Sequence, residues 1–395
     1  MNQKNSLAKI LPVMFGFFIM GIVDLIGTAI NYVKADLSLN DTTANLLSLS
    51  CFLWFLILSV PTGFLMNRFG RKNAVLISFV VTLIGLVLPF VGYKNGQGSF
   101  DFAVIFIAFM FIGIGNTIIQ VALNPLVTNV VSEERRTGTF TLGQFVKSLC
   151  SWLGPNIAAW LAASIFGWTY VFPIFAVITL IAAVWLWLTR INEEGEKSSI
   201  SFAATFAILK NRKILWFFIG ILVLVGVDVG LNATLPKYLQ ERCPDVITSI
   251  SQADTLKSYF YFIVKALGAF VGGILLMKVS EKLFYNISAL MVTAGLALML
   301  ISTAQWSILT ATVIIALGYS NMFAIIFAQA LKQLPAKANE ISSLLIVGVS
   351  GGVIATLLGV ISDIFGTQWA AMLIVAIIWL YMVWLIKPIN AKDEA

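Results

Sequence analysis

The sequence predicts an all-α membrane protein in which twelve transmembrane helices form two pseudo-symmetric halves of six. Of the 395 residues, 59% are hydrophobic and only 11% are charged, whereas about 25% of the residues of a soluble protein are charged. Apolar runs of roughly 17 to 25 residues, the length that crosses a bilayer, recur along the whole chain. One polar segment divides these runs into six and six. An ordinary soluble protein is therefore excluded.

The apolar runs define the order of the helices and the limits of the two halves. We expect spans near residues 9–31, 45–67, 73–92, 101–130, 138–165, 168–190, 213–236, 255–277, 283–303, 306–331, 340–362 and 367–387. The polar segment 191–212 lies between the sixth and seventh spans, and we interpret it as a cytoplasmic linker. It joins an N-terminal half, residues 1–190, to a C-terminal half, residues 213–395.

The basic residues predict the orientation of the chain. With the N-terminus in the cytoplasm, eighteen of the 25 basic residues fall on the cytoplasmic side, and the outer side receives only five, Lys34, Lys94, Lys237, Arg242 and Lys257. This asymmetry satisfies the positive-inside rule and places both termini in the cytoplasm. We therefore expect a multi-pass protein of the cytoplasmic (inner) membrane, a monomer in the lipid bilayer. The net charge of +7 reflects this topology, and we expect no nucleic-acid partner.

The two halves contain related motifs at equivalent places. MGIVDLIG in the first span corresponds to LVGVDVGLN in the seventh, and GFLMNRFGRK after the second span corresponds to GILLMKVSEK after the eighth. IFG follows both the fifth and the eleventh span. Parallel repeats of six spans are the architecture of major facilitator transporters, whose substrate sites lie near the midplane between the halves. We expect this fold and a site in that place.

The segment GFLMNRFGRK resembles a loop of the major facilitator superfamily. In that superfamily the loop between spans 2 and 3 reads GxLxDRxGRR, and Asn67 stands where its Asp is expected. The resemblance implies a gating loop on the cytoplasmic side, formed here by Gly63, Asn67, Arg68, Gly70 and Arg71. The missing charge predicts that this loop closes the cytoplasmic side less firmly than usual.

Longer stretches resemble the fucose, galactose and glucose proton symporter family within this superfamily. They are GIGNTIIQVALNPLVT in span 4, LGQFVKSLCSWLGP in span 5, VGVD in span 7, SNMFAIIFAQALKQL in span 10 and SSLLIVGVSGGVIATLLGVISDIFG in span 11. The resemblance implies uptake of a neutral monosaccharide by alternating access.

Three positions depart from the pattern of that family. Gln120 stands four residues before the pair Asn124 and Pro125, where the family commonly has a proton-carrying acid. Glutamine can bind a sugar hydroxyl, but it cannot carry a proton. The span 5 asparagine of the family aligns with Lys147, and its span 1 aspartate aligns near Thr28, one turn beyond Asp24.

Each half has one acid and one base within its predicted spans. They are Asp24 and Lys147 in the N-terminal half, and Asp228 and Lys265 in the C-terminal half. A charge at the centre of a bilayer costs at least about 2.5 to 3.5 kcal/mol, and a partner of opposite sign limits this cost. We predict two charge pairs, with Asp24 or Asp228 as the acid that responds to a coupling ion. The ion is a proton or sodium, and an uncoupled facilitator with permanently paired charges is the third possibility.

Amide side chains are the candidates for substrate binding. Asn116, Gln120 and Asn124 recur every four residues and so share one face of a helix, and Gln144 shares a face with Lys147. Such a stripe binds sugar hydroxyls or joins neighbouring helices. The full set of predicted substrate-binding residues is Gln120, Asn124, Gln144, Asn116, Asn232 and Asn321.

Several further expectations concern the solute, the glycines and isolated residues. A sugar acid, another organic solute or drugs are alternative substrates, and export is an alternative direction. The absence of histidine, of a thiol dyad and of a metal-ligand cluster argues against an enzyme, and we expect no cofactor or metal. Gly226 and Gly230, which flank Asp228, predict an irregular helix that acts as a gate. We interpret Asp363 as a helix-end residue, and Lys237 and Lys257 as external surface charges.

Overall fold

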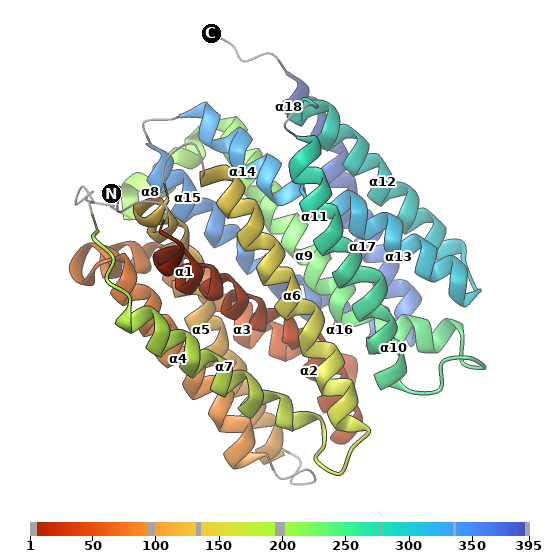
Figure 1. The fold of residues 1–395 in the computed structure, drawn as a ribbon. Coiled ribbons are helices and arrows are strands. Elements are labelled where there is room, and N and C mark those ends of the chain that lie inside the picture. The colour runs from red at the N-terminus through yellow and green to blue at the C-terminus, as the bar shows by residue number, and fades with distance from the viewer. Residues whose placement is uncertain are drawn as a thin grey trace.

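The chain folds into a bundle of long helices (Figure 1). The computed structural model describes residues 6–93, 99–131, 136–193, 202–276, 279–334 and 337–391. Within these ranges all regular elements are helical, and eleven helices are long and apolar enough to cross a membrane. Helix α6, Arg136–Ala162, is a further helix of 27 residues at the position of the fifth predicted span. The predicted all-α membrane fold is confirmed.

The described part of the N-terminal half contains seven α-helices. The first span is divided into α1, Leu7–Met20, a 3₁₀ turn η1, Gly21–Leu25, and α2, Ile26–Asp36. The following elements are α3, Asp41–Phe69; α4, Arg71–Gly92; α5, Ser99–Val130; α6; the 3₁₀ turn η3, Trp168–Tyr170; and α7, Val171–Leu188. Residues 94–98, which include Lys94, lie outside the described residues, as do residues 194–201 of the linker.

The C-terminal half follows the short linker helix α8, Phe202–Ala207, and the turn η4, Ile208–Lys210. Four of its described spans contain breaks in the regular α-helix. The elements are α9, Arg212–Arg242; α10, Ile250–Lys257; a π-helical turn η5, Ser258–Ile263; α11, Val264–Leu275; α12, Glu281–Ile301; α13, Gln305–Tyr319; α14, Met322–Gln333; α15, Ala338–Val347; the 3₁₀ turn η7, Gly348–Val353; α16, Ile354–Phe365; α17, Gln368–Trp384; and α18, Ile386–Asn390.

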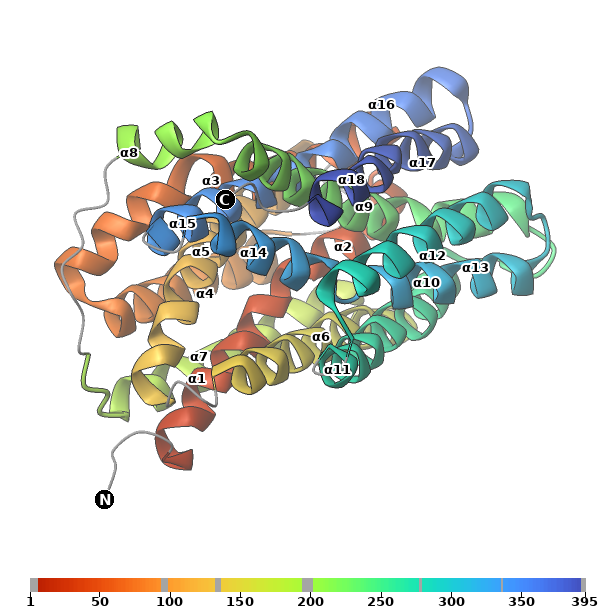
Figure 2. The same ribbon diagram turned by 90° about the horizontal axis from the view of Figure 1, so that it is seen from above.

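Two hydrophobic cores lie side by side. One is formed mainly by residues of α1 to α7 and the other by residues of α9 to α18. In both views the helices α1, α4, α5 and α7 lie on one side and α10 to α13 on the other (Figures 1 and 2). Between the halves, α3 packs along α16 and η7, α2 packs on α9, and α6 packs on α10 and α11. The predicted boundaries at residues 190 and 213 stay a prediction.

The break in the first span brings α6 close to its backbone. A Cβ atom on Gly21 would lie 2.5 Å from the carbonyl oxygen of Lys147 and 2.7 Å from Cβ of Cys150, so only glycine fits here. Irregular helix backbone at membrane depth is found where it is buried in protein or lines a cavity. The break at η1 therefore points to the contact between α6 and the first span as the place to look for a site.

The prediction of an irregular helix at Gly226 and Gly230 is wrong. Helix α9 runs without a break from Arg212 to Arg242. A Cβ atom on Gly226 would lie 2.3 Å from Cδ1 of Ile354, and one on Gly230 would lie 2.6 Å from Cδ1 of Leu358. The glycines thus allow α16 to approach α9, as small residues do between membrane helices.

Candidate functional site

Asp24 lies where helices of both halves meet. It belongs to the turn η1 and is half-buried. Its carboxylate Oδ2 accepts a hydrogen bond from the hydroxyl of Ser151 in α6 at 2.5 Å. Its backbone oxygen accepts a hydrogen bond from Nδ2 of Asn232 in α9 at 2.9 Å. The predicted residue Asn232 therefore joins the C-terminal half to the acid of the first span.

The predicted contact between Asp24 and Lys147 is not formed. Lys147 makes no ion pair within the described part of the chain, and its side chain is partly exposed. Ser151 lies one helical turn further along α6, and the 3₁₀ turn places Asp24 beside this serine. Sequence analysis missed Ser151, although its spacing of four residues from Lys147 places both on one face.

The predicted contact between Asp228 and Lys265 is present. Nζ of Lys265 lies 2.6 Å from Oδ2 and 2.9 Å from Oδ1 of Asp228. The hydroxyl of Tyr261 also donates to Oδ1, and the ammonium lies 4.8 Å from the ring centroid of Tyr319. The side chains of Asp228 and Lys265 are 20% and 18% exposed. Their role in ion coupling stays a prediction.

The amides of span 4 form a ladder on one face of α5. Nε2 of Gln120 donates to Oδ1 of Asn116 at 2.7 Å, and Asn116 donates to the backbone oxygen of Met20 at 2.8 Å. Asn116 thus holds α5 against the end of α1, which supports the structural interpretation of this residue. Asn124 is half-buried and Gln144 is exposed, so both keep polar atoms accessible. Substrate contact stays a prediction for all of them.

Asn321 lies at the break between α13 and α14. It is buried, and its Nδ2 donates to the backbone oxygen of Gly268 in α11 at 2.9 Å. A Cβ atom on Gly272 would lie 2.0 Å from the same Nδ2. This close fit makes Asn321 a contact between helices in this structure, and its predicted role in substrate binding is untested.

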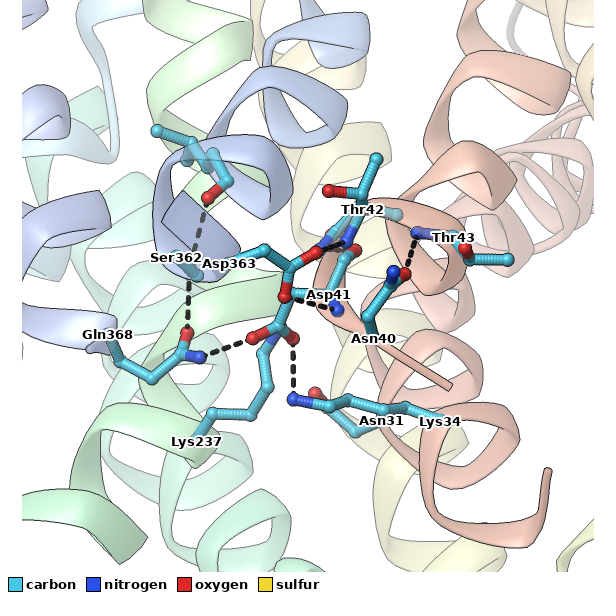
Figure 3. Close-up of polar contacts among 12 residues, drawn as sticks. Asn31, Lys34, Asn40, Asp41, Thr42, Thr43, Lys237, Ser362, Asp363 and Gln368 are labelled. Carbon is cyan, nitrogen blue, oxygen red and sulfur yellow. Dashed lines mark hydrogen bonds and ion pairs between the residues drawn. The ribbon is translucent and has the colours of Figure 1, made fainter. Parts of the chain in front are cut away.

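A buried cluster joins the halves at the end of the bundle opposite the two termini (Figure 3). Oδ1 of Asp41, the first residue of α3, accepts from Nζ of Lys34 at 2.8 Å and from Nζ of Lys237 at 2.7 Å. Oδ2 accepts from Nε2 of Gln368 at 2.6 Å. The side chains of Asp41 and Lys237 are only 5% and 8% exposed. Side chains of α2 in one half and of α9 and α17 in the other therefore donate to one carboxylate.

Asp363 in α16 completes this cluster. Its carboxylate accepts from the backbone N–H groups of Asp41 at 2.9 Å and Thr42 at 2.6 Å, which are free donors at the start of α3 (Figure 3). We name the set Lys34, Asp41, Lys237, Asp363 and Gln368 the latch.

The latch adds to one expectation and corrects another. Asp363 lies in the last turn of its helix as predicted, but it connects the halves. Lys237 is a buried partner of Asp41 and not a surface charge, because α9 continues beyond the predicted end of its span.

At the other end of the bundle, the predicted gating loop contacts its own half and the start of the predicted linker. Gly70 has φ of +87°, a conformation that favours glycine, and separates α3 from α4. The carboxylate of Glu193 accepts from the backbone N–H groups of Arg71 and Lys72, both at 2.7 Å. Nη1 of Arg71 donates to Asn129 in α5 at 2.9 Å.

Two further residues of the predicted loop make no polar contact to the other half among the residues that the structure describes. Gly63 lies within α3, and Arg68 in the last turn of α3 is exposed. The side chain of Asn67 lies outside the described residues, so the predicted weaker closure of the cytoplasmic side stays untested.

Comparison with known proteins decides the family. The sequence pattern of the Major Facilitator Superfamily matches residues 13–244, more than half of the chain. The chain belongs to the major facilitator superfamily. Its members are transporters, so the expected non-enzymatic class agrees with this result. The predicted resemblance to the major facilitator superfamily is confirmed, and so is the prediction of a multi-pass membrane protein.

Relatives within the superfamily cover most of the chain. A glucose/galactose transporter of Brucella abortus is 26% identical over 391 residues, which are 93% of this chain and 91% of the relative. A putative glucose/galactose transporter of Helicobacter pylori is 24% identical over 372 residues, with 88% and 87% covered. The structure of the E. coli fucose:proton symporter FucP has a TM-score of 0.72 at 18% identity and covers 97% of this chain and 98% of its own. This last similarity concerns the fold alone.

Proposed function

We propose that this major facilitator protein imports a monosaccharide across the cytoplasmic membrane by alternating access, with both termini in the cytoplasm. The observation that carries the proposal is the latch, a buried polar contact between the halves at the end of the bundle opposite the two termini. The site around Asp24 lies between this closed end and the other end, which suits a pathway that opens to one side at a time. The names of the two glucose/galactose transporter relatives support a sugar as the solute.

The charges around the pathway favour a neutral solute. Lys265 is neutralised by Asp228, and Lys257 by Asp254. Lys147 is the intramembrane lysine without an ion pair in the described part of the chain. An anionic sugar derivative is the second candidate, and it depends on Lys147 alone. Asn124 and Gln144 offer both donors and acceptors to uncharged hydroxyl groups.

Asp24 is the better of the two predicted ion-responsive acids. A lysine ammonium and a tyrosine hydroxyl hold the carboxylate of Asp228, whereas a serine hydroxyl holds that of Asp24. Asp24 can therefore accept a proton, or bind sodium together with backbone and amide oxygens, without first losing an ion pair. We propose Asp24 as the coupling acid of the N-terminal half.

Uptake of radiolabelled D-glucose and D-galactose into proteoliposomes tests the proposed function. We expect saturable uptake that neutral hexoses compete for and hexuronates do not. We also expect accumulation against the sugar gradient when a proton or sodium gradient is imposed, and loss of accumulation in Asp24→Asn. Stronger competition by hexuronates would favour the anionic candidate, and the absence of saturable sugar uptake would refute the proposal.

Substitution of the predicted binding amides of α5 and α6 by alanine should weaken sugar binding. Each lost hydrogen bond to an uncharged hydroxyl removes about 0.5 to 1.5 kcal/mol, so Gln120→Ala, Asn124→Ala and Gln144→Ala should each raise the Kd a few-fold to about tenfold. Titration calorimetry on purified protein measures this. Asn116→Ala is the control, because it should lower thermal stability by freeing the contact to Met20. Unchanged Kd in all three variants would leave these amides a structural role only.

A further inference from the structure

The hydroxyl of Ser151 lies between two acceptors, the acid of the first span and the backbone of its own helix. Its Oγ is 2.5 Å from Oδ2 of Asp24 and 3.2 Å from the backbone oxygen of Lys147, one turn earlier in α6. A serine hydroxyl has one proton to donate and two lone pairs that accept. Ser151 can therefore donate to only one of these two acceptors at a time.

The two acceptors suit the two charge states of Asp24. When Asp24 is a carboxylate, the serine hydroxyl donates to it, and a separation of 2.5 Å is typical of an O–H group that donates to a charged oxygen. When Asp24 is protonated, its own O–H can donate to Oγ of Ser151. The serine proton then turns to the backbone oxygen of Lys147, the acceptor four residues earlier that serine commonly uses in helices. No atom except hydrogen has to move.

The backbone around Asp24 holds this arrangement in place. A Cβ atom on Gly21 would lie 2.5 Å from the carbonyl oxygen of Lys147, so the close approach of η1 to α6 depends on a glycine. Ser151 is only 3% exposed, whereas Asp24 keeps part of its surface accessible. Solvent can therefore reach Asp24 in this structure, but it does not replace the hydroxyl of Ser151.

The separation of the two oxygens suits a proton better than a metal ion. Oγ of Ser151 and Oδ2 of Asp24 are in direct contact at 2.5 Å. Hard cations such as Mg²⁺ and Ca²⁺ keep each oxygen ligand at about 2.0 to 2.6 Å. A cation bound by both oxygens would therefore push them apart, whereas a proton fits between them as they stand.

We propose that Ser151 is the positioning residue of Asp24, and that the hydrogen bond between them reverses its direction when Asp24 gains a proton. The proton comes from water at the accessible side of Asp24 and returns to water when the acid ionises. The carboxyl group thus keeps one orientation, toward α6, in both charge states. The inference rests on the proposed function, because it takes Asp24 as the coupling acid, and it assigns the coupling ion as a proton.

Other titratable groups surround Asp24. They are Lys147 and Cys150 of α6, Cys51 of α3, Lys257 of α10, Tyr261 of η5 and Tyr319 of α13. Asp228 of α9 acts on the same two tyrosines and is paired with Lys265. Along the first span, the nearest charged residue is Lys34, ten residues away. A substitution at Ser151 leaves all these groups in place, so a change in pH dependence reports the hydroxyl.

The pH dependence of D-glucose exchange in proteoliposomes tests this role. A hydrogen bond to a charged oxygen is roughly twice as strong as one between neutral groups, so loss of the hydroxyl destabilises the carboxylate more than the acid. We expect the midpoint of the pH dependence to lie about one pH unit higher in Ser151→Ala, which is about a tenfold change in proton affinity. Ser151→Thr keeps the hydroxyl and should restore the midpoint of the unchanged protein.

Ser148→Ala is the matched control from the same helix. The hydroxyl of Ser148 also donates to the backbone oxygen four residues earlier, that of Gln144 at 2.9 Å. Loss of a helix contact alone would lower thermal stability in both alanine variants and would leave both midpoints unchanged. An unchanged midpoint in Ser151→Ala, or an equal shift in Ser148→Ala, would overturn the proposal.

Infrared titration of the purified protein needs no transport. The carboxyl band that disappears in Asp24→Asn belongs to Asp24, and its midpoint should move upward by the same amount in Ser151→Ala. A shifted band without any sugar exchange would refute the proposed substrate and keep the role of Ser151. Exchange by Asp24→Asn with the pH dependence of the unchanged protein would refute Asp24 as the coupling acid, and the inference with it. Loss of that dependence in Asp24→Asn with no shift in Ser151→Ala would refute the inference alone.

Discussion

Replacement of Lys237 by methionine is expected to open the latch end of the bundle. Truncation of one partner of a buried charged hydrogen bond costs about 2 to 5 kcal/mol. The contact between Lys237 and Asp41 joins the two halves in this structure, and we expect it to break when this end opens. The cost therefore falls on the closed state, and 2 kcal/mol corresponds to a shift of roughly thirtyfold toward the open state.

The rate of cysteine labelling measures this shift. Ser362→Cys places a thiol beside Gln368, where a membrane-impermeant maleimide can reach it only when the latch end is open. Cys243→Ser removes the native thiol at this end. We expect much faster labelling in Lys237→Met and no change in Lys210→Met, which alters an exposed lysine of the linker turn. Equal labelling of Lys237→Met and the unchanged protein would show that the latch does not control this end.

Asp228→Asn and Lys265→Met are each expected to lower stability strongly, whereas the double variant should recover most of the loss. Removal of one member of a buried ion pair leaves a buried charge without its partner, which costs about 3 to 5 kcal/mol, and removal of both leaves two neutral groups. Partial exposure of both side chains places the expected cost at the lower end of this range. Thermal unfolding of the four proteins in one detergent forms a double-mutant cycle.

An exposed ion pair of the same half provides the matched control. Nζ of Lys332 lies 2.6 Å from Oε2 of Glu281, but these side chains are 58% and 32% exposed. Exposed pairs contribute about 1 kcal/mol or less. Lys332→Met should therefore lower thermal stability only slightly, although its ion pair has the same Nζ–O distance and the same charges as the pair of Lys265. Simple addition of the losses in Asp228→Asn and Lys265→Met would contradict the interpretation that these residues act as one unit.

The sequence alone predicted the class of the protein and its family, because these depend on local properties. Each membrane span satisfies its own backbone hydrogen bonds, so length and apolarity of a run are enough to recognise it. Motifs such as GFLMNRFGRK are contiguous, so the resemblance to major facilitator transporters needed no tertiary structure. The pairing of Asp228 with Lys265 was also within reach, since each is the acid or the base of its half.

Only the tertiary structure decided which side chains touch. Helical spacing assigns Asp24 and Lys147 to faces of their helices, but Asp24 lies in a 3₁₀ turn and its carboxylate contacts Ser151 instead. Lys237 and Lys257 resemble surface charges in the sequence, yet neighbouring helices bury both beside acids. Burial depends on helices far apart in the chain, and contact depends on their packing distance and rotation. A single sequence specifies the spans, whereas the partners of its charges follow from how those spans pack.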